Sequence, residues 1–138
     1  MSKFLVIITF LSLALVSCRE KSKAELTAER ALKAYLDCNL TEMESLASSE
    51  VVEQVRWRIS NLTQAERELL QENIPTVSAE EMEQEDAVCK IAVSANNALI
   101  LDSIGQTGRI EDCRFLLELT RNGNKWKVTT INMLTDKQ

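Results

Sequence analysis

The pattern of hydrophobic and polar positions changes from a helical to an extended period near the middle of the chain. Ser22 and Glu25 have the spacing of a capping box, which predicts that a helix begins there. The apolar residues that follow recur every three or four positions, as on the buried face of a helix. Thr41 and Thr63 each precede a glutamate at the same spacing. The first of these capping boxes predicts the start of a short turn and the second the start of a further helix, which Pro75 ends. The apolar face of the first helix consists of Ala24, Ala28, Ala31, Leu32 and Tyr35.

The helix predicted around residues 51–62 contains a tryptophan on an unexpected face. Trp57 lies nearly opposite the apolar stripe, and tryptophan and arginine are enriched at the centres of protein interfaces. Trp57 with its neighbours Arg56 and Arg58 is therefore a candidate interface. The alternative, which we prefer at this point, is that Trp57 packs under a neighbouring helix. The stripe itself consists of Val51, Val52, Val55, Ile59 and Leu62.

The second half of the sequence has the alternation of a half-buried antiparallel sheet. Asn96-Asn97 is expected to form a tight turn because asparagine tolerates positive φ, and Asn122-Gly123 is the strongest hairpin signal in the chain. The expected fold class is α+β, with N-terminal helices packed on a bent antiparallel sheet of about four strands. These strands are predicted at residues 87–95, 98–104, 109–120 and 125–134.

A strongly acidic segment joins the two halves. From Glu80 to Asp86 the chain has five carboxylates in seven residues. We expect a solvated connector or a short surface helix here. A calcium loop is not indicated, because the spacing of ligands and the fixed glycine of such loops are missing.

The first segment of the chain is apolar but too short to cross a bilayer, which takes about 20 residues. It has the form of a secretory signal. Its end, Leu15-Val16-Ser17-Cys18, resembles the lipobox of bacterial lipoproteins, in which the cysteine receives a diacylglycerol and the signal is cut before it. The resemblance implies lipidation at Cys18. The implied organisation is a signal peptide at 1–17, a lipidated tether at 18–22 and a single domain at 23–138.

The residue after the lipidated cysteine bears on which membrane holds the anchor. In Gram-negative lipoproteins an aspartate at this position usually causes retention in the inner membrane. Arg19 therefore implies an outer-membrane protein that faces the periplasm. Acyl chains such as palmitate on Cys18 would then be the contact with the membrane, because two or three chains give a durable anchor.

Composition excludes several classes of function. The formal net charge is −5, which argues against binding to a phosphate backbone and so against a nucleic-acid partner. The chain has no histidine, so neither a Ser-His-Asp nor a Cys-His site is possible. Its three glycines do not form a phosphate-binding loop. We expect no cofactor and no metal.

The last hairpin, LLELTRNGNKWKVTTI, resembles that of the cystatin-like, nuclear-transport-factor-like cone superfamily, and in particular its small bacterial lipoproteins of unknown function. The resemblance implies a strongly bent sheet around a long helix, with a conical pocket. Enzymes of this superfamily place acid–base groups inside the cone, and the candidates here are Tyr35 on the first helix, with Asp102 and Asp112 on strands. The residues that match the hairpin motif are Leu119, Gly123, Trp126, Lys127 and Val128.

Three cysteines remain once Cys18 is assigned to lipid. Export to an oxidising compartment predicts a disulfide among Cys38, Cys89 and Cys113. In a four-strand meander, the strands of Cys89 and Cys113 lie about 10 Å apart, which favours a bridge from Cys38 to the sheet. If residues 98–104 form a loop, Cys89–Cys113 becomes the natural pair. A zinc site is not indicated, because there is no Cys-x-x-Cys pair.

The sequence alone leads us to expect a non-enzymatic, lipid-anchored module of the cell envelope that binds a protein partner or a small ligand. Two alternatives stay open. One is an immunity or inhibitor lipoprotein that blocks a toxin or a hydrolase. The other is a cone-fold enzyme that uses Tyr35 and Asp102.

Overall fold

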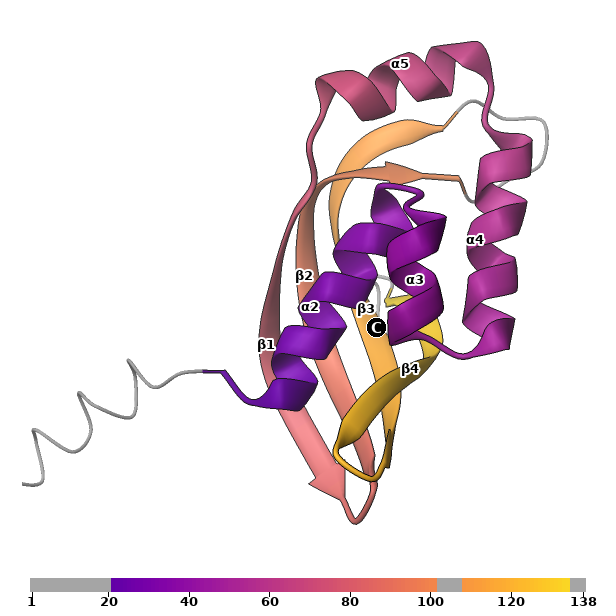
Figure 1. Ribbon diagram of the computed structural model, residues 1–138. Coiled ribbons are helices and arrows are strands. Elements are labelled where there is room, and N and C mark those ends of the chain that lie inside the picture. Colours follow the sequence, from indigo (N-terminus) through magenta and orange to yellow (C-terminus); the bar gives the residue numbers. More distant parts are fainter. Residues whose placement is uncertain (1–20, 102–107, 135–138) are drawn as a thin grey trace, which may run out of the picture.

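Four helices precede four strands in the computed structural model, which describes residues 21–101 and 108–134 (Figure 1). The α+β fold class is confirmed. The predicted lipidation site Cys18, the signal peptide and the candidate Asp102 lie outside the described residues. The elements are α2 (Lys23–Leu36), α3 (Leu40–Leu46), α4 (Ser49–Asn61), α5 (Gln64–Glu72), β1 (Thr76–Glu85), β2 (Val88–Ile100), β3 (Arg109–Asn122) and β4 (Lys125–Leu134).

Two of the three predicted helix caps are confirmed. The Ser22 hydroxyl accepts the Glu25 N–H at 3.2 Å, and the Glu25 carboxylate accepts the Ser22 N–H at 3.0 Å. Thr63 caps α5 in the same way. The start predicted at Thr41 is wrong, because α3 already begins at Leu40. Its N-cap is Asn39, whose side-chain oxygen accepts the Glu42 N–H at 3.2 Å.

The acidic segment is an edge strand rather than a connector. Residues 76–85 form β1, which pairs with β2 alone at one side of the sheet. Two residues, Asp86 and Ala87, link the two strands, and Asp86 has a φ of 55°. Exposed charges on an edge strand prevent pairing with a second chain, so an acidic composition is compatible with a strand at this position.

The two strands predicted at 87–95 and 98–104 are one strand. β2 runs without a hairpin through Asn96 and Asn97, and its register against β3 shifts between Ala95 and Ala98. Asn97 does adopt a positive φ, 60°, as its type allows. Asn97 belongs to a β-bulge and not to a turn, because the strand continues past it and the buried residues on either side, Ala95 and Ala98, face the same core. All the described strands pair antiparallel in the order β1-β2-β3-β4.

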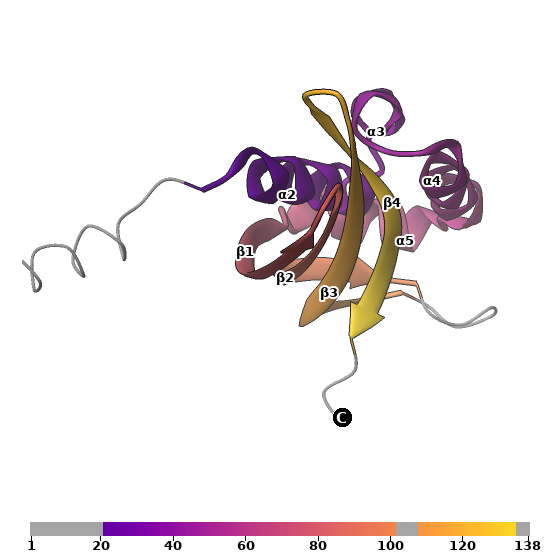
Figure 2. The ribbon, with the colours of Figure 1, turned by 90° about the horizontal axis from the view of Figure 1, so that it is seen from below.

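Each pair of neighbouring strands has one register shift, and together these shifts accompany a strongly bent sheet (Figures 1 and 2). Bulges bend a strand and increase its twist. The helices lie on the concave side of the bend, and α2 runs along it (Figure 2). This is the bent sheet around a helix that the sequence led us to expect.

The core lies between α2 and the concave face of the sheet. Ala24, Ala28 and Ala31 give α2 a narrow buried face, so its backbone lies close to the strands. The connection between α3 and α4 is fixed to the far edge of the sheet, because the Ser48 N–H donates to the Val128 carbonyl at 2.9 Å. The largest fully buried apolar side chains include Leu32, Leu36, Met43, Ile91, Leu99, Leu117 and Leu119.

Candidate functional site

Trp57 lies on the outer face of α4 and is 48% exposed. A neighbouring helix therefore does not cover it, contrary to the alternative that we preferred from the sequence. Arg56 beside it is also exposed, and its guanidinium lies 3.1 Å from the Glu53 carboxylate and 3.9 Å from that of Glu44. The role of Trp57 and Arg56 in an interface stays a prediction.

Arg58, the third residue of that predicted interface, points inward and is 5% exposed. Its Nη2 donates to the Leu99 carbonyl at 3.1 Å, and its guanidinium lies 4.7 Å from the centre of the Tyr35 ring. The assignment to the surface is wrong because Arg58 follows Val51 and Val55 at helical spacing and so shares their face. A cation on the buried face of α4 is stabilised by the aromatic ring and the carbonyl.

Cys38 lies at the end of α2 in a left-handed conformation, with a φ of 57°. The N–H of Cys38 donates to the Tyr35 carbonyl at 3.3 Å, and that of Asn39 donates to the Ala34 carbonyl at 2.8 Å. These two bonds define a Schellman motif, in which glycine usually occupies the position of Cys38. Burial raises the pKa of the Cys38 thiol, although nearby Arg58 opposes the shift. The thiol is therefore protonated near neutral pH.

The structure does not bring the candidate acid–base residues together within the part that it describes. Tyr35 is half-buried under Arg58, and Asp102 lies outside the described residues. Asp112 is exposed, and its carboxylate accepts the Asn97 N–H at 3.0 Å. Asp112 thus stabilises the bulge of β2. Residues 21–101 and 108–134 contain no group of three acidic or cysteine side chains that could hold a metal ion.

No disulfide joins Cys38, Cys89 and Cys113 in the structure, so the helix-to-sheet bridge that we expected is not formed. The other pairing is excluded by register, although β2 and β3 are neighbours. Cys89 lies opposite Leu119 and Cys113 lies opposite Ala95. The two cysteines are therefore six residues apart along the strands, or about 20 Å, far beyond the reach of a disulfide.

Glu66 is a buried carboxylate, 2% exposed, with a structural function. It accepts the N–H of Thr63 at 2.9 Å and also the N–H of Gly108, which directly precedes β3. The first of these bonds contributes most to lowering the pKa of Glu66, and the bond from Gly108 adds to it. The carboxylate therefore ties the start of α5 to the start of β3.

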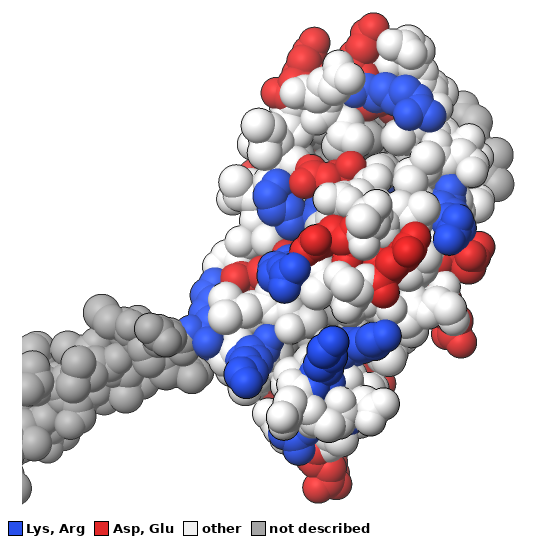
Figure 3. Space-filling model, viewed as in Figure 1, with Lys and Arg blue, Asp and Glu red and all other residues white. Residues whose placement is uncertain are grey.

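A basic groove of about 400 Å³ lies where α2, α3 and the β3–β4 hairpin meet. Three of its side chains are cations, and Figure 3 shows Lys and Arg gathered on the lower part of this face. Lys23, Leu26, Thr27 and Arg30 follow each other at helical spacing, which is a signal that sequence reasoning missed. The groove is lined by Lys23, Leu26, Thr27, Arg30, Ser45, Leu46, Asn124, Lys125 and Trp126.

An acidic surface lies on the opposite side of the sheet. Glu118 alternates along β3 with Leu117 and Leu119, which face the core, so its side chain is on the convex side. It lies opposite Lys90 of β2 and lines a second groove with several acidic side chains. This groove on the convex side is therefore mainly acidic. The acidic side chains of this groove are Glu83, Glu85, Asp86 and Glu118.

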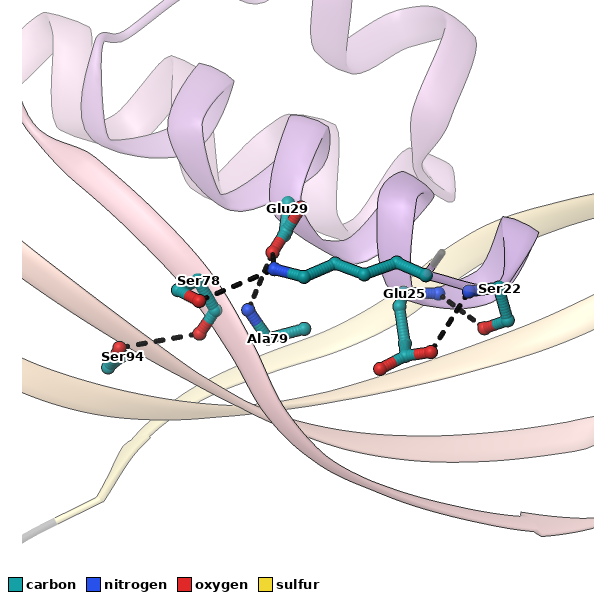
Figure 4. Close-up of polar contacts among 7 residues, drawn as sticks. Ser22, Glu25, Glu29, Ser78, Ala79 and Ser94 are labelled. Atoms are coloured by element: carbon teal, nitrogen blue, oxygen red, sulfur yellow. Dashed lines mark hydrogen bonds and ion pairs between the residues drawn. The ribbon is translucent and has the colours of Figure 1, made fainter. Parts of the chain in front are cut away.

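Polar contacts join the first turns of α2 to the edge strand β1, where Glu29 lies next to Ser78 and Ala79 (Figure 4). The Lys21 ammonium contacts the Glu29 carboxylate and lies 3.3 Å from the Ser78 hydroxyl of β1. Glu29 also accepts the Ala79 N–H at 2.7 Å, next to the bulge in β1. The N-terminal end of α2 is thus held firmly against the edge strand.

No family model matches the chain, and no curated protein matches it. Solved structures resemble its architecture weakly. A de novo designed protein with a curved β-sheet is 9% identical, with a TM-score of 0.46 over 81% of this chain and 99% of that one. An NTF2-like protein involved in plasmid conjugation is 14% identical, with a TM-score of 0.45 over 83% of this chain and 49% of that one.

The intermembrane-space region of a chloroplast protein is 11% identical, with a TM-score of 0.43 over 85% of this chain and all of that one. Because each of these TM-scores is below 0.5, the function has to be inferred from the side chains of this chain. Among the described helices, none combines the length and apolar character needed to cross a membrane.

Proposed function

We propose that this protein is a non-enzymatic, lipid-anchored module of the cell envelope that binds a protein partner through the outer face of α4. The observation that supports the partner is the exposure of Trp57, 48% of which is open to solvent. The lipobox at Cys18 supports the anchor. The location implied by Arg19 is the periplasmic side of the outer membrane.

Trp57 has the surroundings of an interface anchor. Tryptophan offers a large contact area with only two side-chain torsions to fix, so binding costs little conformational entropy. The charged residues next to it, Arg56 and Glu53, already pair with each other at 3.1 Å and present a polar rim. An apolar centre with a polar rim is the usual composition of a protein–protein contact.

The interior offers less support for a ligand. In the described residues, the concave face of the sheet is covered by α2 and α3, whose Leu32, Leu36 and Met43 are completely buried. Tyr35, the candidate for acid–base chemistry, is covered by the guanidinium of Arg58. A contact on the outer surface is therefore the function that these side chains favour.

Site-specific photo-crosslinking in the native envelope tests the partner. A photoreactive amino acid placed at position 57 of the lipidated protein is expected to give one stoichiometric adduct. The matched control is position 74, because Ile74 is 68% exposed but lies outside α4. Once the partner is identified, Trp57→Ala should weaken binding about 30-fold or more, as expected of a hot spot worth at least about 2 kcal/mol. No adduct, or the same adducts from both positions, would show that α4 is not the contact.

The anchor has a separate test. Radiolabelled palmitate should enter the wild-type protein, whereas Cys18→Ser should leave an unlabelled precursor or release soluble protein. Cys38→Ser is the matched control, because it removes a different thiol and should keep the label. If the Cys18→Ser variant still takes up palmitate, Cys18 is not the attachment point.

A further inference from the structure

We propose that the basic groove binds the headgroups of anionic phospholipids in the membrane that holds the anchor. The helix-side face near the start of α2 then rests on the bilayer. This inference depends on the lipid anchor of the proposed function, and it adds a second contact between the domain and the membrane.

The charge of the groove opposes the charge of the whole protein. The chain has a formal net charge of −5, but Lys23, Arg30 and Lys125 converge on one groove. Arg30 contacts the Glu42 carboxylate, whereas Lys23 and Lys125 have no ion-pair partner within residues 21–101 and 108–134. Two ammonium groups are thus available to a phosphate, which accepts hydrogen bonds from lysine as from a point charge.

The apolar residues of the groove fit a bilayer surface better than a free anion. Leu26 is 49% exposed, and Trp126 lines the same groove with its ring 5.4 Å from the Arg121 guanidinium. Tryptophan is enriched at the level of the lipid headgroups, where one part of the ring meets hydrocarbon and the N–H meets water. A leucine, a tryptophan and two lysines together match the interface of a bilayer, in which phosphate and acyl chain lie next to each other.

The tether keeps the groove near the surface. Lys21 contacts Glu29 and lies 3.3 Å from the Ser78 hydroxyl, and only two residues of the sequence lie between it and Cys18, the lipid attachment point of the proposed function. Even fully extended, the Cα atoms of Cys18 and Lys21 are at most about 11 Å apart. The anchor therefore keeps Lys23 and Leu26 at a high local concentration next to the headgroups. A groove with a low intrinsic affinity for the headgroups is then sufficient to dock the domain on the membrane.

The acidic groove on the convex side gives the docked domain an orientation. Glu83, Glu85 and Glu118 lie on the other side of the sheet from the basic groove. Anionic lipids repel them and attract Lys23 and Lys125, so both sets of charges favour the same face toward the membrane. The convex side of the sheet then faces the aqueous compartment.

Fluorescence quenching of Trp126 tests the docking. The mature lipidated protein with Trp57→Phe has Trp126 as its remaining tryptophan, because the chain contains two. It is inserted into vesicles of phosphatidylcholine, with or without about one third phosphatidylglycerol, whose acyl chains are brominated near the headgroup. We expect strong quenching in the anionic vesicles, weak quenching in the neutral ones, and loss of the difference at about 1 M salt.

Matched lysine variants locate the contact. Lys125→Gln should lower the ratio of docked to undocked protein about fivefold, the effect of one cation near an anionic surface, and Lys23→Gln should do the same. Lys90→Gln removes the same charge from the convex side and should have no effect. Equal quenching in both kinds of vesicle, or an equal loss with Lys90→Gln, would overturn the proposal. Relief of the Trp126 quenching in the anionic vesicles by millimolar glycerol phosphate would also overturn it, and would assign a soluble phosphate ester to the groove instead.

The same preparation separates the two proposals. Protein that carries no acyl chain and does not float with the vesicles contradicts the anchor of the proposed function. Protein that floats but shows no dependence of Trp126 quenching on anionic lipid contradicts only the docking.

Discussion

At the scale of single residues, two side chains occupy positions that their types rarely take. Cys38 has a φ of 57° at a position where helices usually have glycine. Arg58 is buried to 95% against Tyr35 and the Leu99 carbonyl, since only 5% of it is exposed. Cys38 directly follows the C-cap of α2, and the Arg58 guanidinium of α4 lies over the ring of Tyr35 in the last turn of α2, so the two residues lie close to the same end of that helix.

Substitutions at position 38 measure the cost of the left-handed backbone. Cys38→Gly should be more stable than Cys38→Ala by about 1 kcal/mol, because a Cβ in this conformation costs about 1–2 kcal/mol and the flexibility of unfolded glycine offsets part of it. Urea denaturation of the two variants gives the difference. Equal stability would mean that the backbone of the variants relaxes out of the left-handed region.

At the scale of elements, single side chains connect parts of the chain that are distant in sequence. Glu66 ties α5 to the start of β3, and Asp112 of β3 holds the bulge of β2. Such connections decide how the ends of the strands are placed, because α5 makes few other contacts with the sheet.

Removing the charge of Glu66 should loosen the contact between α5 and β3. The amide of Glu66→Gln brings an NH2 group against one of two N–H donors, which should cost about 1–3 kcal/mol at neutral pH. Because the pKa of Glu66 is lowered from 4.5, its contribution is present above about pH 4.5 and is lost as the pH falls through the folded value. Urea unfolding should therefore show that the difference in free energy of unfolding between wild type and Glu66→Gln becomes smaller as the pH is lowered from neutral. Glu68→Gln is the control, because Glu68 is exposed on the same helix, and its free energy of unfolding should equal that of wild type.

The bulge of β2 has its own test. Asn97→Val should destabilise the protein by about 1–2 kcal/mol, because a β-branched residue resists the φ of 60° at this position. Asn96→Val changes the exposed neighbour, which has no positive φ, and should stay within about 0.5 kcal/mol of wild type. Equal loss from both variants in urea denaturation would contradict a role of backbone conformation at Asn97.

At the scale of the whole molecule, the separation between α2 and the sheet is set by small residues. Ala28 is completely buried between them. Ala28→Leu should destabilise the protein by about 1–3 kcal/mol, since the added atoms must push the helix away from the strands. Ala65→Leu makes the same change at an exposed position of α5 and should be nearly neutral. Thermal and urea unfolding would measure the loss of stability in each variant. An equal loss in Ala28→Leu and Ala65→Leu would mean that the core rearranges to accommodate the larger side chain.

The sequence predicted the helices well because their signals are local. The caps at Ser22 and Thr63 and the apolar periodicity between them depend on residues within one or two turns. The sheet was harder to predict, since Asn96-Asn97 suits a hairpin turn and a bulge equally, and only pairing with β3 decides between them. β1 was missed because an edge strand needs few apolar residues. The basic groove joins α2 to a hairpin about 100 residues later, a proximity that no local pattern reports.

The bulge at Asn96 and Asn97 also has a consequence for how proteins with this sheet tolerate changes in chain length. Both asparagines are exposed, and the residues on either side of them, Ala95 and Ala98, are buried. Deleting one asparagine would leave one residue opposite Asp112 and restore a regular ladder, while every other side chain kept its face. Insertions and deletions at such points would let a lineage straighten or bend the sheet one residue at a time, and so reshape its concave face without rebuilding the core.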